Sequence, residues 1–178
     1  MATFDEENSI EGAILHVAKL MAAAARTAPK ARGESTLHTL IVTGSDVHPI
    51  IAKMEQISNE ENIPSFYRDA QNLKNCSALV LFGTSIKPLM LQKCGMCGFE
   101  NCTEKTKHPE IPCVFNTGDL GIAIGSAVSV AMDHRIDNRI MYTVGQAVRE
   151  LAIFPKQVTI IYGIPLQAYS KNIFFDRK

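Results

Sequence analysis

Apolar residues recur every three or four positions near the start of the chain, which predicts an amphipathic helix over about residues 9–25. The buried stripe of this helix consists of Ile10, Ile14, Val17, Met21 and Ala24. Pro29 and Gly33 follow the last apolar position, and both residues stop helix propagation. We therefore expect the chain to begin with one long helix that covers the core with one face.

Short apolar segments alternate with helical patterns in the next part of the chain. Strands are predicted over 37–42 and 77–83. The second of these, Ser-Ala-Leu-Val-Leu-Phe-Gly, is a continuous apolar run typical of a strand covered on both faces. Helical spacing of apolar residues predicts helices over 47–58 and 67–73.

The second half of the chain opens with a segment, 84–110, that has no hydrophobic period and collects cysteine, lysine and glycine. Four elements are predicted after it: a short extended piece over 111–115, helices over 119–134 and 142–151, and a strand over 157–164, with an irregular tail from Pro165. Because helices and strands alternate without a linker, we predict a single α/β (α+β) domain over 1–178. The cysteine-rich stretch 84–118 is interpreted as an insertion.

Small residues recur four apart along the predicted helix 119–134, at Gly121 and Gly125 and at Ala123, Ala127 and Ala131. Such rows let another helix approach closely, either in the core or across a dimer interface. The sequence alone leaves both readings open, with the core favoured.

The composition and charge of the chain exclude some classes of function. Eighteen Lys and Arg balance eighteen Asp and Glu, so no basic surface is available for a nucleic-acid backbone. No apolar run reaches the ~18 residues of a membrane span. The N-terminus is acidic where a secretory signal would be basic, so we expect a cytoplasmic protein that binds no membrane. Cytoplasmic cysteines stay reduced, which favours metal or redox chemistry over disulfides.

Four of the five cysteines, Cys94, Cys97, Cys102 and Cys113, form the spacing C-x2-C-x4-C-x10-C. A [4Fe–4S] cluster needs four converging thiolates, and Gly95 and Gly98 would let the backbone turn toward the metal. Three lysines that flank the ligands would offset the negative charge of the cluster: Lys93, Lys105 and Lys107. We predict that the four sulfur atoms lie within roughly 6–7 Å of one another and that Cys76 stays apart as a core residue.

Two alternatives remain open for the cysteines. A structural zinc site also uses four cysteines, usually as two C-x2-C pairs, whereas this chain has one such pair. With zinc, the protein would be a non-catalytic binding or scaffold module. The other alternative is that the thiols bind no metal.

Several segments together resemble the DUF2148 family, prokaryotic proteins described as containing a ferredoxin domain. The matching residues are 23–33 (Ala-Ala-Ala-Arg-Thr-Ala-Pro-Lys-Ala-Arg-Gly), 67–70 (Tyr-Arg-Asp-Ala), the cysteine segment, 119–127, 137–139 (Asp-Asn-Arg) and 174–177 (Phe-Phe-Asp-Arg). The family label implies an iron–sulfur protein but carries no specific activity.

The order of elements is also similar to the FMN-dependent nitroreductase fold. The resemblance rests on Ala28-Pro29-Lys30 after the first helix, on the small-residue helix from Asp119, and on Gly163-Ile164-Pro165 before a terminal arginine. It implies a nitroreductase-like domain, FMN as a second cofactor and, if the protein is an enzyme, a flavin-dependent oxidoreductase. Nitroreductases begin with an Arg-x-x-Arg segment, and this chain has no arginine before Arg26.

A flavin phosphate needs cationic partners, and its ring needs a flat apolar slot. The expected flavin-binding residues are Arg26, Lys30, Arg32, Arg68, Asn72, Met141 and Arg177, which we predict line one cleft. The resemblance further implies a homodimer with the flavin between protomers and the tail 173–175 reaching over the partner. Electrons would pass between cluster and flavin and on to a partner that the sequence does not identify.

Overall fold

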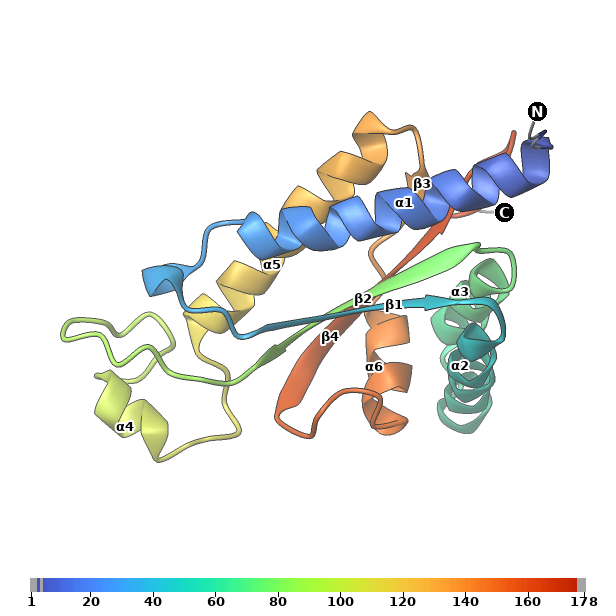
Figure 1. The fold of residues 1–178 in the computed structure, drawn as a ribbon. Coiled ribbons are helices and arrows are strands. Elements are labelled where there is room, and N and C mark those ends of the chain that lie inside the picture. The colour runs from blue at the N-terminus through green and yellow to red at the C-terminus, as the bar shows by residue number, and fades with distance from the viewer. Residues whose placement is uncertain (1–2, 4, 176–178) are drawn as a thin grey trace.

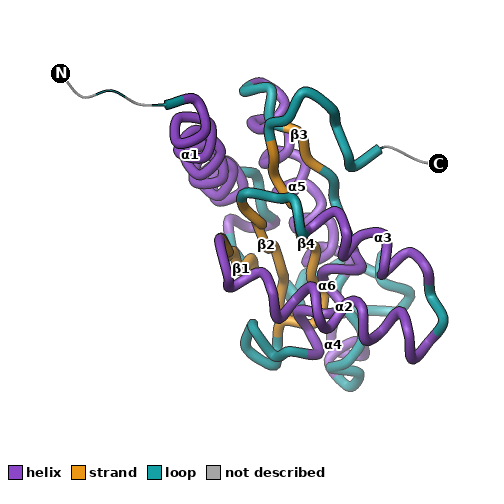
Figure 2. Tube along the Cα trace, turned by 90° about the vertical axis from the view of Figure 1, so that its right-hand side faces the viewer, coloured by secondary structure: helices purple, strands orange, loops and turns teal. Residues whose placement is uncertain are grey.

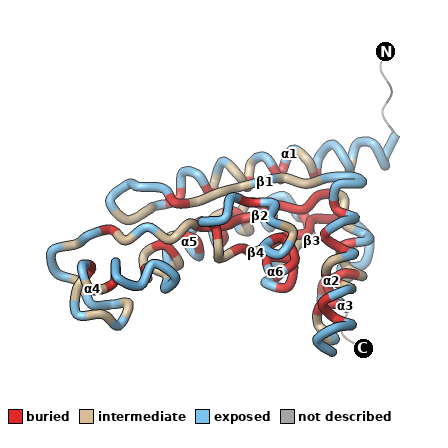
Figure 3. The backbone as a smooth tube through the Cα atoms, turned by 90° about the horizontal axis from the view of Figure 1, so that it is seen from below, coloured by how far each residue is buried: buried red, intermediate tan, exposed pale blue. Residues whose placement is uncertain are grey.

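The computed structural model describes residues 3 and 5–175. A four-stranded antiparallel sheet forms its centre, in the order β1-β2-β4-β3 (Figure 1). The strands are β1 (Leu37–Thr43), β2 (Ala78–Ser85), β3 (Asp137–Asn138) and β4 (Val158–Gln167). The first seven residues of β2 are buried, as the continuous apolar run predicted, because helices cover both faces of the sheet (Figure 3).

Helices α1 (Glu6–Thr27) and α5 (Val114–Asp133) cover one face of the sheet. The row of alanines on α5, Ala123, Ala127 and Ala131, is completely buried against α1 and the sheet. The core interpretation of that row is therefore confirmed. Among the described residues one helix, α5, is long and apolar enough to cross a membrane by length and composition, a test that the core helix of a domain also passes. Its apolar inner face is accounted for by packing in this domain.

The other face is covered by α2 (His48–Glu61), α3 (Pro64–Leu73) and α6 (Tyr142–Glu150), seen together in Figure 2. Helix α6 lies directly on β4. A Cβ atom added at Gly145 would overlap the carbonyl oxygen of Ile161, and one at Gly163 would overlap the side chain of Val144. Glycine at both positions therefore sets how closely the helix approaches the strand.

Three short elements complete the chain: η1 (Ala31–Gly33), η2 (Gly44–Val47) and α4 (Cys102–Thr106). Several predicted boundaries were wrong. Helix α3 begins at Pro64 and not at residue 67. Helix α5 begins at Val114, so 114–115 are helical and not extended. Strand β4 continues through Pro165 to Gln167. Proline has no N–H to donate to a neighbouring strand, and at Pro165 none is needed on the β3 side, because β3 pairs only with Leu166 and Gln167.

Candidate functional site

The cysteine segment leaves the sheet after β2 and returns at α5, at the end of the molecule where η1 also lies (Figure 1). Cys94 and Cys97 lie in the loop and are half-buried. Cys102 is the first residue of α4 and Cys113 is the N-cap of α5, and both are buried. All four thiols are free. As the N-cap of α5, Cys113 makes no side-chain hydrogen bond to the first turn of the helix.

Two glycines shape the turn between the first three cysteines, as the sequence predicted. Gly98 has φ +88°, a left-handed conformation that side-chain-bearing residues rarely adopt, and its N–H donates to the carbonyl of Gly95 at 3.0 Å. A Cβ at Gly95 would come within 3.2 Å of the carbonyl oxygen of Phe99. A side chain would therefore be strained at Gly98 by its backbone conformation and tightly packed at Gly95.

The structure does not show the expected convergence of the four sulfur atoms. Over residues 3 and 5–175, no three His, Cys, Asp or Glu side chains form a group that could hold a metal ion. The donor chemistry still suits a four-thiolate cluster, since all four thiols are free and share one segment. The four-cysteine ligand set therefore stays a prediction. Cys76 lies apart, packed against the core under α2 and α3, and burial raises the pKa of its thiol to about 12.

The three lysines of the segment have different surroundings. Lys93 is exposed, and exposed Lys107 forms an ion pair with Glu104 at 2.9 Å. Lys105 is 1% exposed, and its ammonium donates to the carbonyl of His108 at 3.2 Å. The ring of His108 stacks on that of Phe99, with centroids 5.1 Å apart. Lys105 is thus the one lysine of the three that is enclosed by the segment.

Three of the predicted flavin-binding cations, Arg26, Lys30 and Arg32, gather where α1 ends. The ammonium of Lys30 donates to the carbonyls of Ala25 and Ala28, both at 2.7 Å, and so caps the helix. Burial lowers the pKa of Lys30, and the Asp119 carboxylate opposes that shift.

Asp119 also fixes this turn to α5, because its Oδ2 accepts a hydrogen bond from the backbone N–H of Ala31 at 3.1 Å. Arg32 has φ 59° and donates to the carbonyl of Leu89 at 3.1 Å. In the described part of the chain, the guanidinium of Arg26 has neither an ion pair nor a side-chain hydrogen bond. Arg26 is therefore the cation of the three that is free to meet an anion.

The remaining predicted flavin-binding residues do not join this group within one chain. Arg68 and Asn72 belong to α3 on the other face of the sheet, where Arg68 pairs with the buried Asp69 at 2.8 Å. Met141 is 2% exposed in the core and bridges to Gly163, so it lines no cleft. Arg177 lies outside the described residues. The predicted single cleft is not formed by the described part of one chain.

A cavity of about 470 Å³ lies between the cysteine segment and the turn after α1. Its lining combines Pro29, Lys30 and Ala31, Met96 of the cysteine loop, and Val114, Phe115, Gly118, Asp119 and Ile122 of α5. An adjacent cavity of about 420 Å³ is lined by Arg26, Thr27, Ala28, Pro29, Lys30, Gly33 and Ser35. Of these lining residues the sequence predicted Lys30 as a site residue and missed Asp119, Met96 and Phe115. Met96 occupies one of the two unspecified positions of the C-x2-C pair, and Phe115 belongs to no motif that could have marked it.

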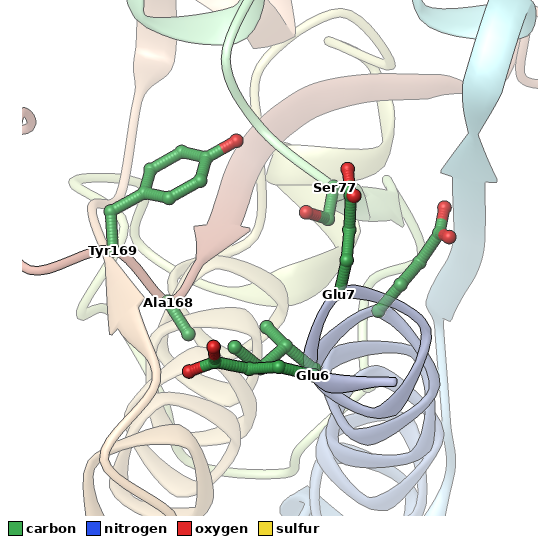
Figure 4. Close-up of a pocket in the computed structure, with 7 residues that line it drawn as sticks. Glu6, Glu7, Ser77, Ala168 and Tyr169 are labelled. Atoms are coloured by element: carbon green, nitrogen blue, oxygen red, sulfur yellow. The ribbon is translucent and has the colours of Figure 1, made fainter. Parts of the chain in front are cut away.

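A third cavity, of about 360 Å³, lies at the other end of α1 (Figure 4). Glu6 and Glu7 face it from the first turn of the helix, opposite Ser77 and Tyr169. Acidic residues in a first turn complement the helix dipole, and Asp5 caps the same turn by accepting from the N–H of Asn8 at 2.8 Å. Helix stability explains this acidic cluster without a ligand.

The fold is that of the nitroreductases. The chain is similar to nitroreductase CinD from Lactococcus lactis in complex with nicotinic acid, with 14% identity, TM-score 0.64 and coverage of 95% of this chain and 81% of that one. It is also similar to a putative nitroreductase from Desulfovibrio desulfuricans in complex with FMN, with 12% identity, TM-score 0.59 and coverage of 92% and 78%. The nitroreductase-like domain expected from the sequence is confirmed.

Residues 110–177 match the family model described as "Uncharacterized protein containing a ferredoxin domain (DUF2148)". The chain is also 39% identical over 167 residues to an uncharacterized protein of Archaeoglobus fulgidus, covering 90% of this chain and 89% of that one. The chain belongs to the DUF2148 family. The description of that family names a ferredoxin domain, and the nitroreductase likeness concerns the fold.

Proposed function

We propose that this protein is a redox protein that holds a [4Fe–4S] cluster on Cys94, Cys97, Cys102 and Cys113 and binds FMN in the adjoining cavity. The cluster would supply one-electron transfer, and the flavin would couple it to two-electron chemistry. The observation that carries the proposal is the shared lining of the 470 Å³ cavity. Met96, between the first two cysteines, faces the same space as the turn after α1.

The lining of that cavity suits the flavin ring. Phe115, Val114, Ile122 and Met96 supply an apolar surface, while Asp119 and Lys30 supply polar groups at its border. Within the described residues, Cys113 is the N-cap of the helix whose first turn contributes Val114 and Phe115. A cluster on Cys113 would therefore lie one helical turn from the flavin slot.

The neighbouring 420 Å³ cavity supports a place for the phosphate. Arg26 lines it, and its guanidinium is free of protein partners within the described chain. Lys30 lines it too, but its ammonium donates hydrogen bonds to the carbonyls at the end of α1. The negative end of the helix dipole also lies here and opposes an anion. Binding therefore depends on Arg26 more than on Lys30.

This dependence is testable by titrating FMN and following flavin fluorescence. For Arg26→Ala we expect affinity to fall about 10-fold or more, the effect of losing one charge-assisted hydrogen bond. Arg149→Ala serves as the control, because Arg149 is an exposed arginine on α6 away from this cavity. Equal FMN affinity of the two variants would show that Arg26 does not contribute to FMN binding. If the unaltered protein did not quench flavin fluorescence at tens of micromolar FMN, the proposal that it binds FMN would be refuted.

A further inference from the structure

A cavity of about 600 Å³ lies where the loop after α6 leads into β4, on the face of the sheet that α2, α3 and α6 cover. The side chains of Phe154, Val158 and Ile161 line it, and each of these residues is at most 7% exposed. The ring of Phe154 is in edge-to-face contact with the ring of His38 on β1, with centroids 6.2 Å apart. The cavity therefore has an apolar wall that the core holds in place.

Two cations line the same cavity, Arg149 from the last turn of α6 and Lys156 from the loop that follows. Within the described residues, neither side chain takes part in an ion pair or a side-chain hydrogen bond. The adjacent carboxylate, Glu150, pairs instead with Lys53 on α2 at 3.6 Å. Two positive charges that line one cavity without a counter-charge repel each other and attract an anion.

Helix α6 ends at this cavity, and free carbonyls at a helix end oppose an anion. Here the carbonyls of residues 147, 148 and 149 accept hydrogen bonds of 3.0–3.3 Å from the backbone N–H groups of residues 151, 153 and 152. Ala152 adopts the left-handed conformation, with φ 52°, that this kind of helix cap requires. The helix dipole that remains opposes a dianion more than a monoanion, so the cavity suits a carboxylate better than a phosphate.

We propose that this cavity binds a small organic carboxylate with an apolar body. Arg149 can donate two parallel hydrogen bonds to the carboxylate, because guanidinium and carboxylate groups match in geometry. Lys156 adds a second positive charge, and the hydroxyl of Thr159, which also lines the cavity, is a further donor. The apolar body of the ligand packs against the apolar wall. This site is independent of the proposed cluster and flavin, since it shares no lining residue with either cavity at the end of α1.

The test uses naphthoate as the probe, titrated into isotope-labelled protein while the backbone amide shifts are followed by NMR. We expect saturable shifts that are largest for residues 149–161, which surround the cavity. Naphthamide has the same rings without the charge, so it should bind about 10-fold or more weakly, the effect of losing the charge-assisted hydrogen bonds. Naphthyl phosphate should also bind more weakly than naphthoate.

Arg149→Met removes the charge but keeps an apolar stem, and its affinity for naphthoate should fall about 10-fold or more. Arg135→Met is the matched control, because Arg135 is an exposed arginine in the turn after α5 and does not line the cavity. Equal affinity of the two variants would overturn the proposal, as would the lack of saturable shifts or shifts centred on another part of the chain. Equal binding of naphthoate and naphthamide would overturn it too, since apolar contact alone would then explain binding. Tighter binding of naphthyl phosphate would overturn the assignment to a carboxylate.

Discussion

At the scale of single residues, three ionisable groups differ in what surrounds them: Asp69 and Lys105 are buried, and Cys76 is partly buried. The carboxylate of Asp69 accepts hydrogen bonds from Thr143 at 2.7 Å and from Arg68 at 2.8 Å, which joins α3 to α6. Cys76 is surrounded by apolar side chains and its thiol stays protonated. Lys105 has only a carbonyl. The first two are satisfied structural groups, and within the described residues the third is held by one backbone hydrogen bond.

The raised pKa of Cys76 predicts a specific dependence of stability on pH. In the unfolded chain the pKa of this thiol is near its ordinary value of 9.0, whereas in the fold burial raises the pKa to about 12. The native state therefore keeps the proton that the unfolded state loses, and the stabilisation is complete below about pH 9 and is lost as pH rises toward 12. Relative to Cys76→Ala, the unaltered protein should lose about 2 kcal/mol of unfolding free energy between about pH 7 and 10.5.

Chemical denaturation in the presence of reductant measures this difference. The other four cysteines are present in both proteins, so their titration cancels in the comparison. Parallel pH profiles for the two proteins would show that the Cys76 thiol is not held in the apolar surroundings described.

At the scale of elements, two glycines allow the close approach of α6 to β4. Gly145→Ala would bring a methyl group into the backbone carbonyl of Ile161, which cannot rotate away as a side chain could. We expect a loss of about 1–3 kcal/mol in the unfolding free energy, the usual cost of overpacking. Thermal or urea denaturation measures it.

Gly12→Ala is the matched control, because Gly12 lies in α1 and an added Cβ would meet nothing within 4 Å. Alanine has a better helix propensity, so this variant should gain about 0.5–1 kcal/mol. If Gly145→Ala were as stable as Gly12→Ala, the close packing of α6 on β4 would be refuted.

An element could be predicted where residues close together in the sequence determine it, and not where contacts formed only on folding do. The stripe from Ile10 to Ala24 and the apolar run of β2 predicted their elements because burial alone decides them. The start of α5 was missed since its first turn, at Val114, carries no polar N-cap signal; Cys113 occupies that position. The scattered cations could not be placed by sequence, because the capping role of Lys30 and the pairing of Arg68 with Asp69 arise only on folding.

At the scale of the whole molecule, the outer face of α5 carries an apolar surface that one chain leaves exposed. Gly121, Gly125 and Ile140 line a cavity of about 380 Å³ together with Ile160 and Tyr162. Ile140 is 45% exposed and the nearby Ile122 on α5 is 49% exposed. We propose that a second copy of the chain covers this face, which would also place the flavin slot between protomers.

Light scattering at micromolar concentration tests this assembly. The unaltered protein should be a dimer, and Ile140→Glu should shift it to monomer by burying a charge in the interface. Ile153→Glu, at another exposed isoleucine after α6, should remain a dimer. A monomeric unaltered protein would contradict the assembly, and so would an Ile140→Glu variant that stays dimeric.

The central claim, that the cysteine segment holds a [4Fe–4S] cluster, is tested most directly by metal and sulfide analysis of the anaerobically purified protein with its visible spectrum. We expect a brown protein with broad absorption near ~400 nm and about four iron and four sulfide per chain. Cys102→Ser should lose most of this iron, and Cys76→Ser, at the buried cysteine outside the segment, should retain it. A colourless protein with one zinc per chain, or iron that is unaffected by Cys102→Ser, would contradict the claim.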